Sequence, residues 1–282
     1  MFSIVILETI CSLPERPRED VHDVCRRLRG SSMKVIRSCI AYLVFFISTV
    51  ILGLAAIAVA YTTRRTDWAH LVGRLWGNVN LRCAGIKVHV EGLENIDPVR
   101  AYVYAANHQG GFDILAILGR LPVQFRWLAK EELFHVFVMG QAMKAIGYIP
   151  IDRRDRRKAF ESITRAAEKI RSGTSVVIFP EGTRSPDGIM RDFKKGGFIL
   201  AIKSQQPIVP VSISGSHAII PNKGDWVVNP GAIHITIGSP IPTEGCTARD
   251  RDRLIERVRQ AIREHLTVKE GGLLPDREPA SS

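Results

Sequence analysis

The longest apolar stretch of the chain is an uncharged run over residues 38–63, SCIAYLVFFISTVILGLAAIAVAYTT. A helix needs about 20 apolar residues to cross the hydrocarbon core of a bilayer, so the run predicts a membrane helix that either spans or enters one leaflet. Tyr42 and Tyr61 lie near its ends, where aromatic rings favour the interface. A buried core helix is the alternative, but a run of this length without a polar face has few places in a soluble protein.

The flanks of this run are basic on both sides, and Arg64 and Arg65 follow it directly. A cleavable signal peptide fits less well, because the run begins late and no small-residue cleavage site follows it. Since lysines and arginines also precede the run, the positive-inside rule does not decide its orientation.

The next segment carries large apolar residues at helical spacing. Its two tryptophans suit a helix at the membrane interface, and a helix packed on the protein core is the equal alternative. The residues of this stripe are Trp68, Leu71, Val72, Leu75, Trp76 and Val79.

From about residue 87 the pattern changes to short β-branched and aromatic runs that alternate with helical ones. Seven runs are typical of strands: KVHVEG, AYVYAA, FRWLA, GYIPID, SVVIFP, IVPVSIS and AIHITIG. One predicted helix contains Phe160 and Ile170, and another contains Leu254 and Leu266. We therefore predict a single α/β domain with a mixed, largely parallel sheet flanked by helices. The expected division is a basic segment 1–37, the membrane helix 38–63, the domain 64–269 and a mobile tail 270–282.

Composition narrows the functional classes. With 45% hydrophobic and 24% charged residues, the chain is typical of globular proteins. The net charge of +11 suggests an anionic partner: nucleic acid, lipid headgroups or a phosphorylated substrate. The basic segments lack aromatic interleaving and nucleic-acid motifs, so we expect no nucleic acid. Five scattered cysteines predict no disulfide framework, and His217 and His234 lack partners at metal-ligand spacing, so we expect no metal.

The first candidate for chemistry is NHQGGFD, residues 107–113, after a predicted strand. Histidine is the side chain that most often exchanges protons near neutral pH, so His108 is a candidate base for an attacking alcohol. A carboxylate on its other ring nitrogen would fix the tautomer, and Asp113 is the candidate. This spacing needs a turn, for which Gly110 and Gly111 offer unusual backbone angles. Asp113 could instead cap the following helix.

Three further segments follow or form predicted strands. GYIPIDRR carries Arg153, whose guanidinium fits phosphate oxygens, although its charged surroundings are also typical of a solvated surface. FPEGTRS combines a Gly–Thr turn with Arg184 and predicts a site for a phosphate or a developing oxyanion. Ser185 lacks a G-x-S-x-G elbow, which disfavours a serine nucleophile. VPVSISG contains Pro210, which we expect at a sheet edge or a bulge.

In this order, NHQGGFD, GYIPIDRR, FPEGTRS and VPVSISG resemble the four sequence blocks of the glycerolipid acyltransferase family, which includes the 1-acyl-glycerol-3-phosphate (lysophosphatidate) acyltransferases. The resemblance implies direct acyl transfer to a lysolipid hydroxyl. It implies that His108 is the base and Asp113 its orienting carboxylate, supported by Asn107 and Gln109. The substrate-binding residues that it implies are Lys130, Arg153, Glu181, Gly182, Thr183 and Arg184.

The expected reaction transfers an acyl group from acyl-CoA or acyl carrier protein to the free hydroxyl of 1-acyl-glycerol 3-phosphate, giving phosphatidic acid. No cofactor is implied, because the acyl donor is a substrate. The expected partners are membrane lipids, this donor and a lysophosphatidate-like acceptor. We expect a membrane location, the cytoplasmic membrane if the source is bacterial, with the catalytic domain facing the cytoplasm.

Three alternatives remain open. The acceptor could be another lysophospholipid, glycerol 3-phosphate or an amino-acid lipid. The chain could also be a lipid-binding scaffold without catalysis, or a membrane-tethered hydrolase that uses water. The intact H-x-x-x-x-D pair argues against the scaffold, since binding alone needs neither a base nor its orienter.

Overall fold

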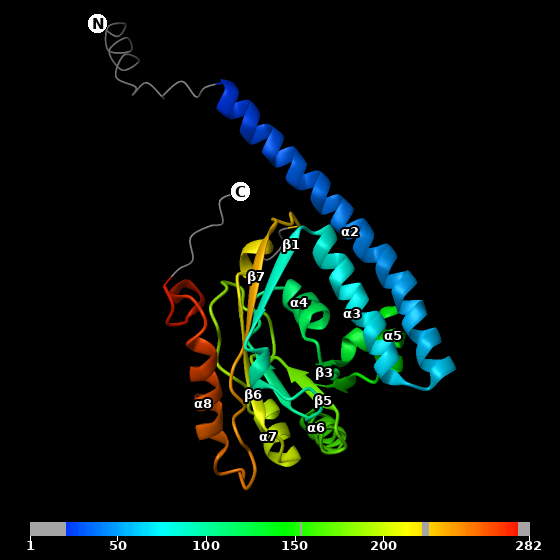
Figure 1. Ribbon diagram of the computed structural model, residues 1–282, viewed down its shortest axis with the longest axis vertical. Helices are drawn as coiled ribbons and strands as arrows, with labels where there is room; N and C mark the ends of the chain where they lie inside the picture. The colour runs from blue at the N-terminus through cyan, green and yellow to red at the C-terminus, as the bar shows by residue number, and fades with distance from the viewer. Residues whose placement is uncertain (1–20, 153, 222–225, 276–282) are drawn as a thin grey trace, which may run out of the picture.

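The computed structural model describes residues 21–152, 154–221 and 226–275. Its centre is one seven-stranded sheet with helices on both faces (Figure 1). The seven strands predicted from the sequence are all present, which confirms the α/β fold. They are β1 Ile86–Glu91, β2 Val103–Ala106, β3 Phe125–Lys130, β4 Ile149–Ile151, β5 Ser175–Ile178, β6 Ile208–Ser214 and β7 Gly231–Ile237.

The strand order is β1-β7-β6-β2-β5-β3-β4, and every neighbouring pair is parallel except β6 and β7. The sheet is therefore mixed and largely parallel, as predicted. The five strands from β6 to β4 point the same way, so their carboxyl ends lie at one edge of the sheet. Ligands of α/β proteins usually bind at this edge.

Of the two expectations for Pro210, a sheet edge or a bulge, the edge is wrong, because β6 is an interior strand between β7 and β2. The carbonyl of Pro210 accepts a hydrogen bond from the N–H of Gly238 (2.9 Å), just after β7 ends at Ile237. The missing N–H of the proline therefore falls where regular pairing with β7 stops, which removes the usual cost of proline inside a sheet.

Alternate residues of each strand face two separate cores. In β2, Tyr104 packs with residues of α3 and α4, whereas Val103 and Ala105 pack with residues of α6, α7 and α8. These helices and their partners are α2 Val21–Thr63, α3 Thr66–Cys83, α4 Phe112–Arg120, α5 Met139–Ile146, α6 Arg156–Arg171, α7 Lys195–Ser204 and α8 Arg251–Arg263. Short 3₁₀ turns lie at η1 Leu93–Asn95, η2 Glu131–His135, η3 His217–Ile219 and η4 Val268–Glu270.

Helix α2 runs along the side of the domain and pairs with α3 (Figure 1). One face of α2 packs against the body of the protein: the Ser38 hydroxyl accepts the N–H of Val228 (2.8 Å), and Ala56 is buried. The opposite face exposes large apolar side chains in a continuous stripe. Its members include Ile36, Ile40, Leu43, Ile47, Val50, Ile51 and Leu54.

Helix α3 has both of the roles that its sequence allowed: one side packs on the protein core, and the other side is exposed as in an interfacial helix. Its small residues face the domain, and a Cβ atom on Gly77 would lie 3.0 Å from the carbonyl oxygen of Leu115 in α4. Trp68, Leu71 and Leu75 are instead about half exposed on the outer side. Part of the predicted apolar stripe therefore lies on the outward face, whereas Val72 and Trp76 of the same stripe pack against the core, together with the small residues.

The C-terminal segment differs from the expectation of a mobile tail beginning at residue 270. The Glu270 carboxylate accepts hydrogen bonds from the Ser214 hydroxyl (2.6 Å) and the Gly215 N–H (2.7 Å) at the end of β6. The N–H of Leu274 also bonds to the carbonyl of Leu266. The chain is thus held against the domain beyond Glu270, and residues 276–282 lie outside the described part.

Candidate active site

The sequence blocks converge at the carboxyl edge of the sheet. His108 of the first block follows β2, Phe179 of the third block follows β5, and Lys130 ends β3. These three strands are adjacent, in the order β2-β5-β3. The fourth block contributes β6 on the other side of β2, and the second block contains β4 at the end of the sheet.

His108 and Asp113 form a hydrogen-bonded pair. The His108 Nδ1 atom lies 2.8 Å from Asp113 Oδ2, and the carboxylate is fully buried. The same oxygen accepts the N–H groups of Gln109 (2.8 Å) and Gly110 (2.9 Å). Asp113 therefore fastens the turn before it and leaves Nε2 of the ring for a proton from a ligand, while the start of α4 has no side-chain cap.

Neither glycine of this turn has a positive φ, and the need for glycine at position 110 comes from the lack of room for a side chain. Gly111 has φ −65° and ψ −26°, which any residue adopts, and Gly110 is not among the residues with positive φ. A Cβ atom on Gly110 would instead lie 2.9 Å from the carbonyl oxygen of Ser216. The expected turn is present, but the unusual backbone angles expected of its glycines are not what it uses, and close packing just beyond the end of β6 explains Gly110.

The third block clamps the backbone of His108. Glu181 accepts the N–H of His108 (2.7 Å) with one carboxylate oxygen and the N–H of Arg191 (2.9 Å) with the other. The carbonyl of His108 accepts the N–H of Ser185 (2.9 Å). Burial raises the pKa of Glu181, and the two N–H donors partly oppose this shift. Glu181 does not line the cavity described below, so its geometry suits a brace rather than the expected contact with the acceptor.

The flanking amides of the first block have separate surroundings. Asn107 joins the block to β6: its amide nitrogen donates to the Ile213 carbonyl (2.8 Å), and its oxygen accepts the Ile213 N–H (2.7 Å). Gln109 is buried, and both polar atoms of its side chain lack a hydrogen-bond partner among the described residues. Asn107 thus ties the first block to β6, whereas the structure gives no contact that explains Gln109.

Three stacked rings form the wall beside the base. The His108 ring lies on Phe179 with centroids 3.9 Å apart and an interplanar angle of 13°. Phe179 in turn stacks on Trp127 of β3 at 5.3 Å. The stack fixes the plane of the imidazole and shields one of its faces from water. Sequence reasoning did not identify Phe179 or Trp127 as site residues, because each belongs to an ordinary apolar strand pattern.

A cationic rim lies next to His108. Lys130 pairs with Glu132 (3.0 Å), which also lies 3.6 Å from Arg154, and Lys130 is about half exposed. Arg184 is exposed, and a Cβ atom on Gly111 would lie 3.4 Å from its guanidinium. Of the other predicted substrate-binding residues, Thr183 lies on the cavity wall, and Arg153 lies outside the described residues.

Gly182 is the position of the third block that requires glycine. Its φ of +76° lies in the left-handed region, which other residues rarely adopt. Its N–H donates to the Phe179 carbonyl (3.0 Å), which closes the turn. The oxyanion donor that we expected near Gly182 is therefore not this N–H group.

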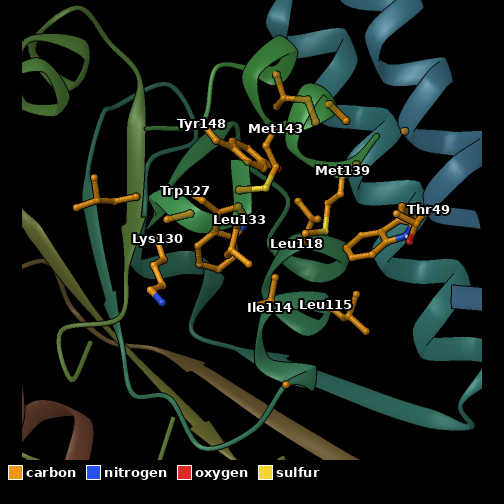
Figure 2. A pocket seen from close by; sticks show the side chains of 18 of the residues that line it. Thr49, Ile114, Leu115, Leu118, Trp127, Lys130, Leu133, Met139, Met143 and Tyr148 are labelled. Atoms are coloured by element: carbon orange, nitrogen blue, oxygen red, sulfur yellow. The ribbon is translucent and has the colours of Figure 1, made fainter. Parts of the chain in front are cut away.

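A cavity of about 540 Å³ opens from His108 toward the N-terminal helices. Figure 2 shows its labelled wall residues, with Met139 and Met143 of α5 pointing into it between Trp127 and Thr49 of α2. Its lining is almost entirely apolar, and the one hydroxyl contributed by α2 is engaged: Trp76 donates to Thr49 Oγ1 (3.0 Å). Among the described residues, the charged side chains that line it are Lys130 and Arg184.

This arrangement suits proton transfer at the meeting point of an apolar chain and an anionic group. A buried carboxylate orients the imidazole, the cavity accepts hydrocarbon, and the rim accepts negative charge. Ser185 donates its hydroxyl to Asp187 (2.6 Å) rather than to His108, so it is not arranged as a nucleophile activated by this base. In the described part of the chain, no cluster of three His, Cys, Asp or Glu side chains forms a metal site.

Comparison with known proteins agrees with this geometry. Residues 87–214 match the family model described as acyltransferase. The chloroplastic 1-acyl-sn-glycerol-3-phosphate acyltransferase of Arabidopsis thaliana is 33% identical over 216 residues, which cover 76% of this chain and 59% of that protein. The 1-acyl-sn-glycerol-3-phosphate acyltransferase of Cocos nucifera is 28% identical, covering 88% of this chain and 80% of the relative.

A solved structure extends the likeness to three dimensions. The crystal structure of the 1-acyl-sn-glycerophosphate acyltransferase PlsC from Thermotoga maritima superposes with a TM-score of 0.70 at 27% identity. The match covers 82% of this chain and 94% of that one. The chain spans about three fifths of the length of the Arabidopsis relative. With motif order, fold and site in agreement, the chain belongs to the acyltransferase family that includes these 1-acylglycerol-phosphate acyltransferases.

Proposed function

We propose that the protein transfers an acyl group from acyl-CoA or acyl carrier protein to the free hydroxyl of 1-acyl-glycerol 3-phosphate, giving phosphatidic acid. The observation that carries this proposal is the position of the His108–Asp113 pair, between an apolar cavity and a cationic rim. A lysophosphatidate has the same two parts, a hydrocarbon chain and a phosphate, on either side of its reactive hydroxyl.

The mechanism that this geometry supports has no covalent enzyme intermediate. His108 Nε2 takes the proton of the acceptor hydroxyl as its oxygen attacks the thioester carbonyl carbon. Asp113 keeps the proton on Nδ1 and stabilises the imidazolium. When the tetrahedral intermediate collapses, the C–S bond breaks, and the departing thiolate receives the proton from the imidazolium. The N-terminus of α4, which begins beside the cavity residue Gly111, favours the developing oxyanion.

The rim would hold the acceptor phosphate. Lys130 and Arg184 supply positive charge within the cavity wall, and Thr183 contributes a hydroxyl to the same wall. Arg153 is assigned to the same group from its place in the second block. We assign Glu181 and Asn107 to positioning, because their polar atoms are occupied by backbone groups that fix the first block.

We further propose that α2 and α3 attach the enzyme to one leaflet. The apolar span, Met33–Thr63, packs one face on the domain and exposes the other. A perpendicular crossing would draw α3 and the adjoining domain into the bilayer together with α2. An in-plane attachment leaves the exposed stripe in lipid and the basic turn at Arg64 and Arg65 near headgroups. We expect the catalytic domain to face the cytoplasm.

A product assay tests the function. The purified protein in phospholipid vesicles would receive acyl-CoA or acyl carrier protein and, in parallel, lysophosphatidate, lysophosphatidylcholine, glycerol 3-phosphate or an acylated amino-acid lipid. We expect phosphatidic acid from lysophosphatidate as the main product. Diacyl product from another acceptor alone would replace the assigned substrate, and release of free fatty acid alone would indicate a hydrolase. No turnover of any acceptor would favour a lipid-binding scaffold.

A further inference from the structure

The loop between η2 and α5, residues 136–138, presents an aromatic ring to the outside of the protein. Phe137 is 91% exposed, and Val136 beside it is 46% exposed. Val138, in contrast, is only 6% exposed. The loop therefore buries one apolar side chain and projects the other two, a distribution that costs free energy in water unless a partner covers Phe137.

The backbone holds this arrangement in a strained turn. Val138 has φ 58° and ψ −57°, and the N–H of Met139 donates to the Phe137 carbonyl at 2.7 Å. These values define a γ-turn with positive φ, a rare conformation that is unfavourable for a β-branched residue. Strain of this kind persists where the surrounding structure enforces it, often at functional sites. Here it turns Val138 inward and Phe137 outward.

The inward contact of Val138 fixes the position of the loop along the apolar helix. A Cβ atom on Gly53 would lie 2.7 Å from Val138 Cγ1, so the turn sits directly against α2. Gly53 belongs to the apolar span Met33–Thr63. At a rise of roughly 1.5 Å per residue, it lies about 15 Å along the helix from Thr63. The exposed ring is therefore beside the interior of the span, not at its polar end.

We propose that Phe137 and Val136 insert into the acyl-chain region of the same leaflet as the outer face of α2. The loop packs on α2 at Gly53, next in the chain to the exposed Leu54 of that face, which supports a hydrocarbon partner rather than a polar one. Leu133 and Met139, which flank the loop, both line the apolar cavity. The inserted loop would thus join the bilayer interior to the cavity wall and provide long-chain lipids with a route to His108. The inference rests on the proposed membrane-bound acyltransferase activity.

The test compares bilayer-resident and water-soluble acceptors in the full-length protein. Phe137→Asp places a charge in the inserted loop, Phe137→Leu keeps it apolar, and Val99→Asp is the matched control. Val99 is 87% exposed in the segment before β2, at the opposite edge of the sheet from the site. We expect Phe137→Asp to lower kcat/KM at least tenfold for long-chain lysophosphatidate in vesicles, with no change for a short-chain soluble lysophosphatidate. Phe137→Leu and Val99→Asp should match wild type on both acceptors.

A second measurement reports insertion directly. Tryptophan fluorescence of Phe137→Trp, after subtraction of the wild-type signal, should be quenched by vesicles of lipids brominated along their acyl chains, while Val99→Trp should not be. Absence of quenching at residue 137, as for a loop that binds another protein, would overturn the inference, as would equal loss by Phe137→Asp on both acceptors. Failure of the wild-type protein on both acceptors would instead contradict the proposed function.

Discussion

At the scale of single residues, Asp113 has the most constrained role. Its Oδ2 atom accepts from the imidazole and from two backbone N–H groups, and an amide oxygen in the same place would carry no negative charge. We expect Asp113→Asn to lower kcat by roughly two to four orders of magnitude, because the imidazolium that forms during proton transfer then lacks its stabilising carboxylate. Steady-state kinetics in vesicles measures the loss, and circular dichroism checks the fold. Near-normal kcat would remove Asp113 from the mechanism.

A substitution at Glu181 tests whether this residue positions His108 or binds the acceptor. In Glu181→Gln, the amide can accept only one of the N–H groups from His108 and Arg191, and the other is left beside a second donor. An unsatisfied buried donor costs about 1–3 kcal/mol, so we expect lower stability. We also expect a reduced kcat with little change in the KM for lysophosphatidate. A raised KM at normal kcat and stability would restore the role in acceptor binding.

Arg184 belongs to the rim that we assign to the phosphate. A hydrogen bond to a charged group contributes roughly 1.5–3 kcal/mol, which corresponds to about a ten- to hundredfold rise in KM when Arg184→Ala removes it. The KM for lysophosphatidate should rise and that for the acyl donor should not. Arg249→Ala, an exposed arginine before α8, is the matched control. An effect confined to the acyl donor would move Arg184 to the donor site.

The sequence predicted the contact of His108 with Asp113 because both residues lie in one short block, where a local turn suffices to join them. The role of Glu181 was not predictable in this way. It depends on a contact between positions 73 residues apart, which only the adjacency of β2 and β5 creates. The stack of His108 on Phe179 has the same origin.

At the scale of elements, the attachment of α3 to the sheet gives a pH-dependent prediction. His70 of α3 is fully buried beside Tyr148 and Phe125. Burial, followed by the charges of Arg126 and Arg74, lowers its pKa to about 3. In the unfolded chain, His70 therefore becomes protonated as the pH falls below an ordinary histidine pKa of about 6.5. In the folded protein it becomes protonated only near pH 3.

Stability should consequently fall as the pH drops below about 6.5, by up to roughly 1.4 kcal/mol per pH unit from this one group. His70→Phe should remove that part of the slope. The measurement is the free energy of unfolding in detergent for both proteins between pH 6.5 and 5. Parallel slopes for the two proteins would show that His70 does not remain neutral in the folded state.

The elements themselves were largely predictable, since β-branched runs and helical spacing reflect burial that is local in the sequence. Phe160 is one of the apolar residues that predicted α6, yet it is 52% exposed, and the Lys203 ammonium lies 4.1 Å from its ring centroid. Packing of α3 on the core was one of the two readings, but the small residues of its inner face, such as Gly77, were not identified because they carry no apolar signal. The strained turn at Val138 has no signal in the local composition either.

At the scale of the whole molecule, the cavity is lined by elements from several regions of the chain, and no single sequence motif predicts it. Its wall comes from α2, α3, α4, β3 and α5 as well as from the first and third blocks. The apolar N-terminal helix therefore contributes to the site as well as to membrane attachment. Sequence periodicity predicted the helix but not its contact with the catalytic domain, because that contact depends on how α2 folds back along α3.

The central claim is that His108 activates the acceptor hydroxyl for direct acyl transfer. Its most direct test is the rate of phosphatidic acid formation from lysophosphatidate and acyl donor by the His108→Ala protein in vesicles, beside wild type. We predict that turnover falls by at least about a hundredfold, the lower end of what a general base contributes, while folding and vesicle binding stay unchanged. Wild-type turnover by a folded, vesicle-bound His108→Ala protein would contradict the claim.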